Sequence, residues 1–395
     1  SAGAAARANP TAPSATVTLG VIGNGGRATQ MLPVFLSQPG TRVLAVCDAV
    51  RERRERAKAT VDAFYGNSDC KAYRDFRDLL ARSDIDALYI ATGDRWHARL
   101  AIYAMQAGKD VYCEKPISLS IHEGDAVVKA AARYRRVYQG GVQRRTVGNF
   151  MTAMSLAKSG RLGRLHTLHA GMAGMGRSAA NHFLPEEPLP PADEIDWNMW
   201  LGPTPWRPYN NAYLKRWHGE YDYHGDLTEW GSHTLDLCQM VLNREHTTPV
   251  RYKPIDETTL HAWYADGIQV VMRQKGFRNS CAVRFEGDDG WVEAGYSGGI
   301  EVSSEALKKE LADLPKVENG IDVVAHTRNF LDCVKSRGAT AANPEVMRRS
   351  HIACHAAALS WLLGRKLEMD PKTETFLRDD EANRLRSRPE RDWTV

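Results

Sequence analysis

The chain has 395 residues, 43% of them hydrophobic and 25% charged, which is enough apolar material for two folded domains. Its 52 basic and 48 acidic residues give a formal net charge of +4 and are mixed along the chain, so nothing indicates binding to nucleic acid or to a membrane surface. No stretch approaches the roughly 20 apolar residues that a membrane span requires. The expected partner is therefore a small molecule.

Two features bear on the cellular compartment. Residues 1–15 are rich in alanine, serine and proline without an apolar signal core, which predicts a flexible leader. The mature end of an exported precursor and a trimmed terminus both have this composition, so a periplasmic and a cytoplasmic location stay open. The seven cysteines are scattered without a Cys-x-x-Cys pair and indicate neither a disulfide framework nor a zinc site.

The first third of the chain alternates apolar runs of strand length with segments of helical periodicity. This alternation is typical of a parallel sheet with helices on both faces and predicts an α/β domain over residues 16–145. The predicted strands are Thr16–Ile22, Arg42–Cys47, Ala87–Ala91, Asp110–Glu114 and Arg136–Val142. The predicted helices are Arg27–Ser37, Arg51–Tyr65, His97–Lys109 and Ser120–Tyr134, the last opened by a Ser-x-x-Glu capping box.

A second domain is expected over residues 146–370, where longer, aromatic-rich connections separate the strands. Alternating hydrophobicity there predicts a largely antiparallel sheet, closed by two helices. The predicted elements are strand runs at His261–Gln274 and Cys281–Ser297, a turn at Gly287–Gly290, and helices at Ile321–Ser336 and Pro344–Leu363. A polar C-terminal tail follows at residues 371–395.

The strongest chemical signal is a glycine-rich turn after the first predicted strand. Gly23, Gly25, Gly26 and Arg27 stand between this strand and the next helix. Glycines let the backbone bend and approach a pyrophosphate, whose charge then lies at the helix N-terminus. Asp48 closes the second strand, where a carboxylate binds the adenosine ribose hydroxyls and repels a 2′-phosphate. The predicted cofactor is therefore NAD rather than NADP, and the predicted chemistry is hydride transfer.

Glu114-Lys115-Pro116 ends another predicted strand. Ligands of an open parallel sheet gather at the carboxyl ends of its strands, so Lys115 is expected beside the nicotinamide. Its ammonium group could hydrogen-bond the reacting hydroxyl and share its proton. A surface lysine in a turn is the alternative if the motif is taken alone.

Glu229 and His233 stand four residues apart in a segment with a helical apolar pattern, so they share one helix face. Such a pair can act as an oriented general base, in which the carboxylate fixes the imidazole tautomer and His233 accepts a hydroxyl proton. The same spacing suits a metal ion, but no third ligand is evident in the sequence, and no metal is expected. A helix-capping or core histidine is the ordinary alternative.

Aromatic residues crowd the stretch from Trp197 to Trp217, in which Trp206 and Tyr209 are candidate substrate contacts. Flat apolar faces with N–H donors line sugar pockets, but packing between two domains would explain the same cluster. Both interpretations stay open. His351 and His355 lie four apart in an apolar helix pattern without a nearby acid and are expected to be structural.

Four segments together resemble the glucose-fructose oxidoreductase, inositol dehydrogenase and MocA superfamily. They are Gly23-Asn24-Gly25-Gly26-Arg27-Ala28, Ala91-Thr92-Gly93-Asp94-Arg95-Trp96-His97-Ala98, Glu114-Lys115-Pro116-Ile117-Ser118 and Gly141-Val142-Gln143-Arg144-Arg145. Downstream, the runs Trp200–Tyr209, Glu229–Asp236 and Asp380–Arg384 look like one bacterial, sugar-active subgroup of it. The resemblance spans nearly the whole chain.

The resemblance implies a Rossmann domain, a second α/β domain with an open, mainly antiparallel sheet, and NAD or NADP in the cleft between them. It also implies homodimers or homotetramers that pack through the open sheet. The cofactor contacts that it implies are Gly23, Gly25, Gly26, Arg27, Asp48, Thr92, Trp96, His97, Glu114, Lys115 and Gln143.

The same resemblance implies that Lys115, Glu229 and His233 contact the reacting carbinol. Arg144 matches a position near the nicotinamide and the substrate. The sequence departs from the pattern at His224, where the turn before the helix commonly has a second glycine. His224 is therefore expected to be an added substrate contact.

The leading hypothesis is an NAD-dependent oxidoreductase that takes hydride from a sugar ring hydroxyl, with C3 as the expected carbon. The first alternative is a redox-neutral glycoside hydrolase that oxidises C3 transiently, eliminates the aglycone, adds water and retains its NAD. A bound-cofactor aldose oxidoreductase comes next. A sugar or cofactor sensor without turnover is the alternative from another class.

Overall fold

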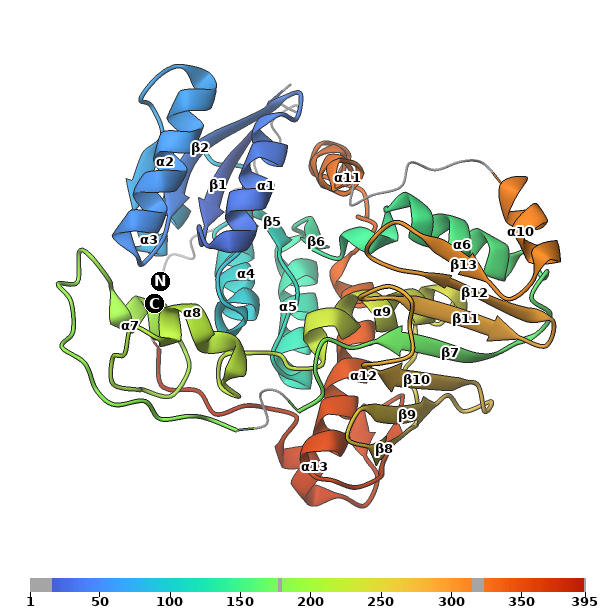
Figure 1. The fold of residues 1–395 in the computed structure, drawn as a ribbon. Helices are drawn as coiled ribbons and strands as arrows, with labels where there is room; N and C mark the ends of the chain where they lie inside the picture. The colour runs from blue at the N-terminus through green and yellow to red at the C-terminus, as the bar shows by residue number, and fades with distance from the viewer. Residues whose placement is uncertain (1–15, 177–179, 315–322, 394–395) are drawn as a thin grey trace, which may run out of the picture.

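Two separate sheets, of six and nine strands, organise the protein (Figure 1). The computed structural model describes residues 16–176, 180–314 and 323–393, so the predicted leader lies outside the described residues. One sheet is parallel and the other mainly antiparallel, which confirms the predicted α/β fold class. None of the helices in these three ranges has the length and apolar character needed to cross a membrane.

The six-stranded sheet is entirely parallel, with the order β3-β2-β1-β4-β5-β6. Its strands are β1 (Val17–Ile22), β2 (Thr41–Cys47), β3 (Lys71–Tyr73), β4 (Ala87–Ile90), β5 (Asp110–Cys113) and β6 (Tyr138–Gly140). Its helices are α1 (Gly26–Leu36), α2 (Arg51–Tyr65), α3 (Phe76–Leu80), α4 (His97–Gln106) and α5 (Ile121–Tyr134). The strand order reverses beside β1, which places a ligand crevice at the carboxyl ends of β1 and β4.

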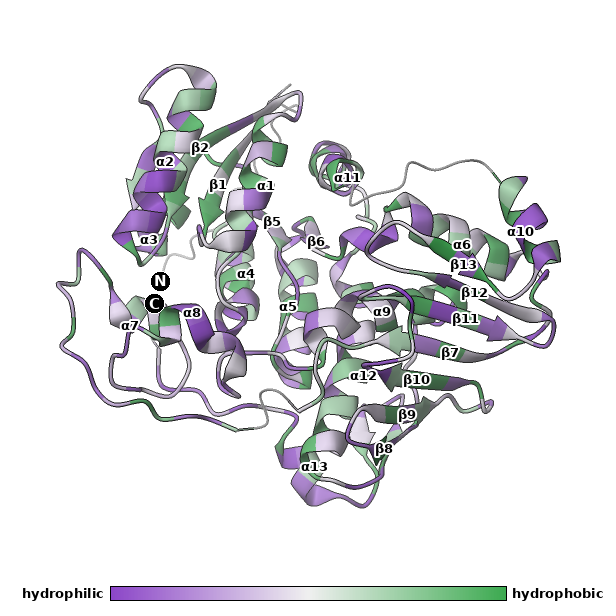
Figure 2. Cartoon of the chain, viewed as in Figure 1, coloured by the Kyte–Doolittle hydropathy of each residue, from purple (hydrophilic) through white to green (hydrophobic). Residues whose placement is uncertain are grey.

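Burial explains why these segments form strands and helices. All residues of β4 and β5 are buried, because helices cover both faces of a parallel sheet. Figure 2 shows β1 and β2 as largely hydrophobic and α2 as largely hydrophilic. The predicted capping box begins α5, since the Ser120 hydroxyl accepts the N–H of Glu123 at 3.2 Å.

The nine-stranded sheet has the order β13-β12-β11-β7-β10-β9-β8-β14-β15 and is antiparallel except where β7 pairs with β10. Its strands are β7 (Leu165–Gly171), β8 (Arg251–Asp256), β9 (Thr259–Trp263), β10 (Gln269–Arg273), β11 (Val283–Gly287), β12 (Gly290–Ala294), β13 (Ile300–Val302), β14 (Leu367–Asp370) and β15 (Thr375–Phe376). The predicted run His261–Gln274 is a hairpin of two strands rather than one. The helices that pack on this sheet are α6 (Gly148–Lys158), α9 (Thr228–Val241), α10 (Glu305–Ala312) and α12 (Pro344–Leu362).

Helix α11 (Val324–Ser336) packs on the parallel sheet, although the sequence assigned it to the second domain (Figure 1). Phe330 and Leu331 are fully buried in the cluster formed by β1 and α1. The ring of Phe330 also lies 5.7 Å from that of Tyr112 in β5. The first two residues of the predicted helix, 321–322, lie outside the described residues.

A long connection before α9 covers one end of the parallel sheet. Residues 193–218, here called the cover segment, contain α7 (Trp197–Leu201) and α8 (Tyr213–Arg216). Its aromatic side chains form a buried cluster with Val50 of the Rossmann domain, comprising Trp197, Trp200, Tyr209 and Tyr213 together with Tyr223. Packing between the two halves of the protein is therefore the role of most of the crowded aromatic residues.

The C-terminal residues 386–393, here called the strap, follow α13 (Asp380–Arg384) and run back across the cover segment (Figure 1). Arg391 donates to the carbonyl oxygens of Gly202 (2.7 Å) and Asn198 (2.9 Å). The ring of Trp393 lies 5.4 Å from that of Trp96 in the Rossmann domain. The strap thus fastens the cover segment to the parallel sheet.

Candidate active site

A cavity of about 350 Å³ lies over the carboxyl ends of β1, β2 and β4. Gly23 there has a φ of +84°, and a Cβ at this position would stand 2.5 Å from the backbone nitrogen of Thr92, so only glycine fits. At Gly25 and Gly26 an added Cβ would meet nothing within 4 Å. The turn exposes the bare backbone that a pyrophosphate needs, and the residues present fit a dinucleotide.

Asp48 lines the same cavity at the end of β2. Its carboxylate accepts the backbone N–H groups of Asn24 (2.7 Å) and Val50 (2.9 Å), which fix its orientation. Burial raises the pKa of Asp48, although Arg53 and these two hydrogen bonds act in the opposite direction. Each carboxylate oxygen keeps a second acceptor position for a ribose hydroxyl. Arg53 and Arg74 also line the cavity, and the sequence analysis missed both.

The cover segment forms the opposite wall of the cavity through Met199, Trp200, Leu214, Lys215, Trp217 and His218. Arg95 donates to the carbonyl oxygen of Trp200 at 2.8 and 2.6 Å. Trp96, a predicted cofactor contact, lines the cavity and donates to the carbonyl oxygen of Met199 at 2.8 Å. The crowding of aromatic residues was the one sequence signal for this wall, and it did not identify the lining residues.

Glu114 joins two of the other predicted cofactor contacts, Arg27 and Gln143. Its buried carboxylate accepts hydrogen bonds from Arg27 (3.1 Å), Tyr89 (3.1 Å) and Gln143 (3.3 Å). Arg27 belongs to the glycine turn, and Gln143 follows β6. These bonds connect the pyrophosphate turn directly to the strand end that carries Lys115.

Lys115 is held at the junction of the two halves of the protein, where its Nζ donates to the carbonyl oxygen of Glu229 at 2.8 Å. The loop after it is fixed by two buried histidines. The Nε2 of His351 accepts the N–H of Ile117 at 3.0 Å. The ring nitrogens of His97 lie 2.7 Å from the carbonyl oxygen of Pro116 and 3.1 Å from that of Thr92. His97, predicted as a cofactor contact, therefore braces this loop and does not line the cavity.

His233 is 5% exposed on α9, and its Nδ1 has no hydrogen-bond partner among the described residues. Burial holds the pKa of His233 well below its usual range, and the positive charges of Arg144 and Lys115 lower it further. The imidazole is therefore neutral at physiological pH and can accept a proton.

Glu229 faces His224, and its predicted role in fixing the tautomer of His233 stays a prediction. The Nε2 of His224 lies 3.8 Å from the Glu229 carboxylate and 3.9 Å from that of Asp94. Its Nδ1 accepts the N–H of Asp226 at 3.1 Å, so the ring proton is on Nε2 and faces the two carboxylates. Burial lowers the pKa of His224, although both carboxylates oppose this shift. The sequence analysis missed Asp94 as a member of this group.

The other predicted substrate contacts differ in how deeply they are buried. Arg144 is buried, with its guanidinium 5.1 Å from the ring of Tyr296. Trp206 is 56% exposed and Tyr209 only 6%, the latter within the aromatic cluster. Neither Trp206 nor Tyr209 lines the dinucleotide cavity.

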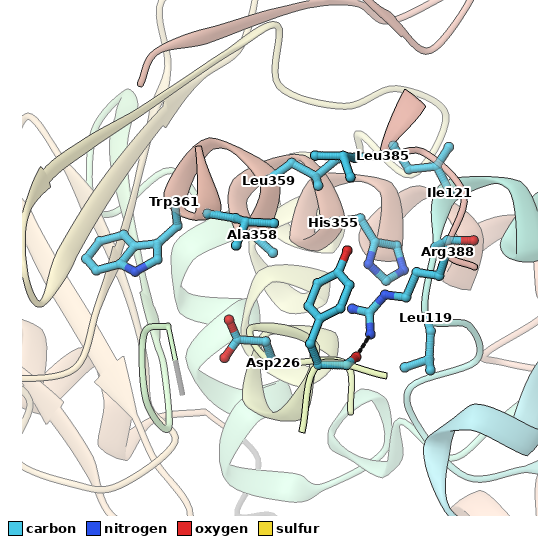
Figure 3. Close-up of a pocket in the computed structure, with 12 residues that line it drawn as sticks. Leu119, Ile121, Asp226, His355, Ala358, Leu359, Trp361, Leu385 and Arg388 are labelled. Carbon is cyan, nitrogen blue, oxygen red and sulfur yellow. Dashed lines mark hydrogen bonds between the residues drawn. The ribbon is translucent and has the colours of Figure 1, made fainter. Parts of the chain in front are cut away.

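Arg388 of the strap supports the loop that carries His224. It donates to the carbonyl oxygen of Tyr221, drawn as a dashed line in Figure 3, and to that of His224 at 3.0 Å. A small cavity of about 30 Å³ lies beside it, with Asp226 and His355 in its lining. The strap therefore reaches both the cover segment and the backbone at His224.

These features define a class of protein: a two-domain, dinucleotide-dependent protein of the oxidoreductase type, with its cofactor cradle at the switch point of a parallel sheet. Residues 17–142 match the family described as "Oxidoreductase family, NAD-binding Rossmann fold", and residues 177–395 match its "C-terminal alpha/beta domain". The chain belongs to this Gfo/Idh/MocA oxidoreductase family, which confirms the resemblance and the NAD-binding fold.

Curated relatives match about a third of the chain. A glycosyl hydrolase family 109 protein of Saccharopolyspora erythraea is 39% identical over 126 residues, or 31% of this chain and 27% of that protein. A second one, of Streptomyces niveus, is 37% identical over 128 residues, or 31% of this chain and 25% of the relative. The match thus spans about a quarter of the length of these relatives.

Solved structures of similar fold cover nearly the whole chain. An aldose-aldose oxidoreductase of Caulobacter crescentus aligns with a TM-score of 0.63 and 17% identity, over 90% of this chain and all of that one. The WlbA dehydrogenase of Chromobacterium violaceum, in complex with NADH and UDP-GlcNAcA, aligns with a TM-score of 0.66 and 16% identity, over 92% and 99% of the two chains. At this identity the likeness shows a shared fold.

Proposed function

We propose that this protein is an NAD-dependent enzyme that oxidises a ring hydroxyl of a sugar or glycoside, with C3 as the expected carbon. The observation that carries the proposal is a buried, neutral His233 whose pKa is lowered by the charge of Lys115, which is itself held to α9 by its hydrogen bond to the Glu229 carbonyl oxygen. Glu114 connects this strand end to Arg27 of the glycine turn, so acid–base groups and cofactor cradle form one unit. A sensor without turnover has no need of such a pair.

The residues of the chain have distinct roles in this proposal. The glycine turn and Asp48 would hold NAD, which supplies a hydride acceptor when bound. His233 accepts the proton of the reacting hydroxyl, because its pKa keeps the imidazole neutral. Lys115 uses one N–H on the carbonyl oxygen of Glu229, so two remain to hydrogen-bond the substrate oxygen.

Redox-neutral glycoside hydrolysis is the second candidate, and the cover segment favours it. This segment is tied to the Rossmann domain by Arg95 and Trp96, and the strap fastens it from outside. Such a closed wall would retain the dinucleotide between turnovers. In this route a C3 ketone acidifies the C2 proton, the aglycone leaves by elimination, water adds, and the ketone is reduced again. The name of the curated relatives supports the same reaction.

One experiment separates these candidates. Purified protein without added cofactor is incubated with α- and β-nitrophenyl hexosides in deuterated water, while nitrophenol and reduced nicotinamide are followed by absorbance. Nitrophenol release with deuterium at C2 of the product would establish the hydrolase. Reduced nicotinamide that accumulates only after NAD and free sugars are added would establish the dehydrogenase. Neither signal with any sugar would favour a sensor.

The assembly stays a prediction as well. We propose that the protein forms a homodimer or homotetramer through the open face of the nine-stranded sheet. Measuring its mass in solution by light scattering tests this proposal. A monomer at all concentrations would exclude it.

A further inference from the structure

Arg144 differs from every other buried arginine in the described part of the chain. Six arginine residues there are 9% exposed or less: Arg54, Arg95, Arg144, Arg145, Arg207 and Arg348. Five of them donate hydrogen bonds to carboxylates or backbone carbonyl oxygens. Within the described residues, the guanidinium of Arg144 makes no hydrogen bond or ion pair, and its Nε is buried without a partner.

In the described part of the protein, two aromatic rings face this guanidinium. It lies 5.6 Å from the ring of Phe150 and 5.1 Å from that of Tyr296. Cation–π contacts offset part of the free-energy cost of removing a guanidinium from water. A buried charge is nevertheless ordinarily paired with an opposite charge. No carboxylate among the described residues is paired with Arg144, although a buried guanidinium ordinarily has such a partner.

The two residues that flank Arg144 in the sequence fix its position. Gln143 donates a hydrogen bond to Glu114 in the cofactor-binding half, and Arg145 donates two hydrogen bonds to Asp236 of α9, at 2.6 and 2.9 Å. Arg144 stands between these two anchors, and its charge acts on His233. It thus belongs to the reacting end of the site.

The carboxylates of the site already have other partners. The carboxylate of Glu114 accepts a hydrogen bond from Arg27, and the carboxylate of Glu229 faces His224. Lys115 adds a second positive charge, since it and Arg144 both lower the pKa of His233 and so act on the same part of the site. This charge pattern favours an anionic substrate.

We propose that Arg144 binds a carboxylate of the substrate, so that the sugar acted upon is a uronic acid or a glycoside of one. The inference rests on the proposed function of the same site and names its substrate class. A guanidinium offers two parallel N–H donors that match a carboxylate, and burial strengthens such a pair. Tyr296, 48% exposed beside it, offers a ring face for the sugar.

Calorimetric binding to the full-length, NAD-loaded protein tests this. D-glucuronate is compared with D-glucose, and D-galacturonate with D-galactose. We expect at least one uronate to bind about 10- to 100-fold more tightly than its hexose. Arg144→Gln should abolish this preference, while Arg144→Lys should keep part of it because the charge remains without the planar fork. Arg251→Gln is the matched control, because Arg251 stacks on Trp263 at 4.3 Å far from the site.

Several outcomes would overturn the inference: equal affinity for uronate and hexose, no binding of either uronate, or a preference that survives in both Arg144 variants. A variant that loses NAD instead of uronate affinity would assign Arg144 to the cofactor and also overturn it. If a uronate binds with the expected preference but neither uronates, free hexoses nor nitrophenyl glycosides are oxidised or cleaved, the proposed function fails while the carboxylate site at Arg144 stands.

Discussion

In the proposed reaction, the acid–base chemistry depends on His233, which burial keeps uncharged. We expect His233→Ala and Lys115→Ala each to lower kcat by about 10²- to 10⁴-fold, because each removes a group that moves or holds the reacting proton. Binding of NAD, measured by calorimetry, should change less than about twofold. Exposed His246 provides the control His246→Ala. Unchanged turnover in both variants would refute these roles.

Asp48 is the residue expected to choose between the two dinucleotides. Asp48→Ala removes the acceptor for the ribose hydroxyls and the charge that repels a 2′-phosphate, while Arg53 and Arg74 remain in the same cavity. The variant should bind NAD at least about tenfold more weakly, and the ratio of its affinities for NAD and NADP should decrease. Dissociation constants for both dinucleotides provide the measurement. An unaltered ratio would show that another group reads the ribose.

The positions of residues at strand ends could be predicted from the sequence. The contacts between residues that loops bring together could not. The glycine turn, Asp48 and Lys115 lie at strand ends, where position follows from the parallel sheet itself. The contact of Glu229 with His224 depends on how the chain turns before α9, which helical spacing does not reveal. The same is true of Asp94, which reaches His224 from the loop after β4.

At the scale of elements, we expect the strap to control how firmly the cover segment closes over the cofactor. Ending the chain after Leu385, or Arg391→Ala in the full chain, removes hydrogen bonds to Gly202 and Asn198. We expect NAD to leave about tenfold faster, which release of bound nucleotide on dilution would show. Arg384→Ala, an exposed position on α13, is the control. Equal release rates in truncated and intact protein would refute this role of the strap.

Some of the elements that the sequence missed are short or solvent-facing, whereas α6 and β7 are longer and contribute buried residues. β3 has three residues at the edge of the parallel sheet, without a buried face, so no apolar run marks it. The hairpin of β9 and β10 was merged into one run because alternation continues through its turn. The buried strands of the Rossmann domain were found because helices on both faces make them continuously apolar.

For the whole molecule, buried neutral histidines predict loss of stability in acid. Burial lowers the pKa of His326 and of His351 to about 4. An unfolded chain takes up these protons near pH 6.5 and the folded chain does not, so their contribution is complete above pH 6.5 and falls as the pH drops toward 4. At pH 5 each of these two histidines lowers the free energy of unfolding by about 2 kcal/mol relative to its value well above pH 6.5.

Thermal unfolding between pH 7.5 and 5 checks this expectation. The Tm should fall steadily below pH 6.5, and His351→Gln should reduce the slope of that fall. A Tm that stays constant down to pH 5 would contradict it. A slope that is the same in the variant would assign the acid sensitivity to other groups.

The path of α11 has a consequence for how the protein can be divided. Phe330 and Leu331 complete the core beside β1 and α1, while Met347 of α12 and Met199 of the cover segment complete the other side of the parallel sheet. A fragment ending near residue 145 would leave both apolar surfaces in water. The two halves should therefore unfold in one cooperative transition, and dissection at this boundary should give an aggregating fragment instead of an independent nucleotide-binding module.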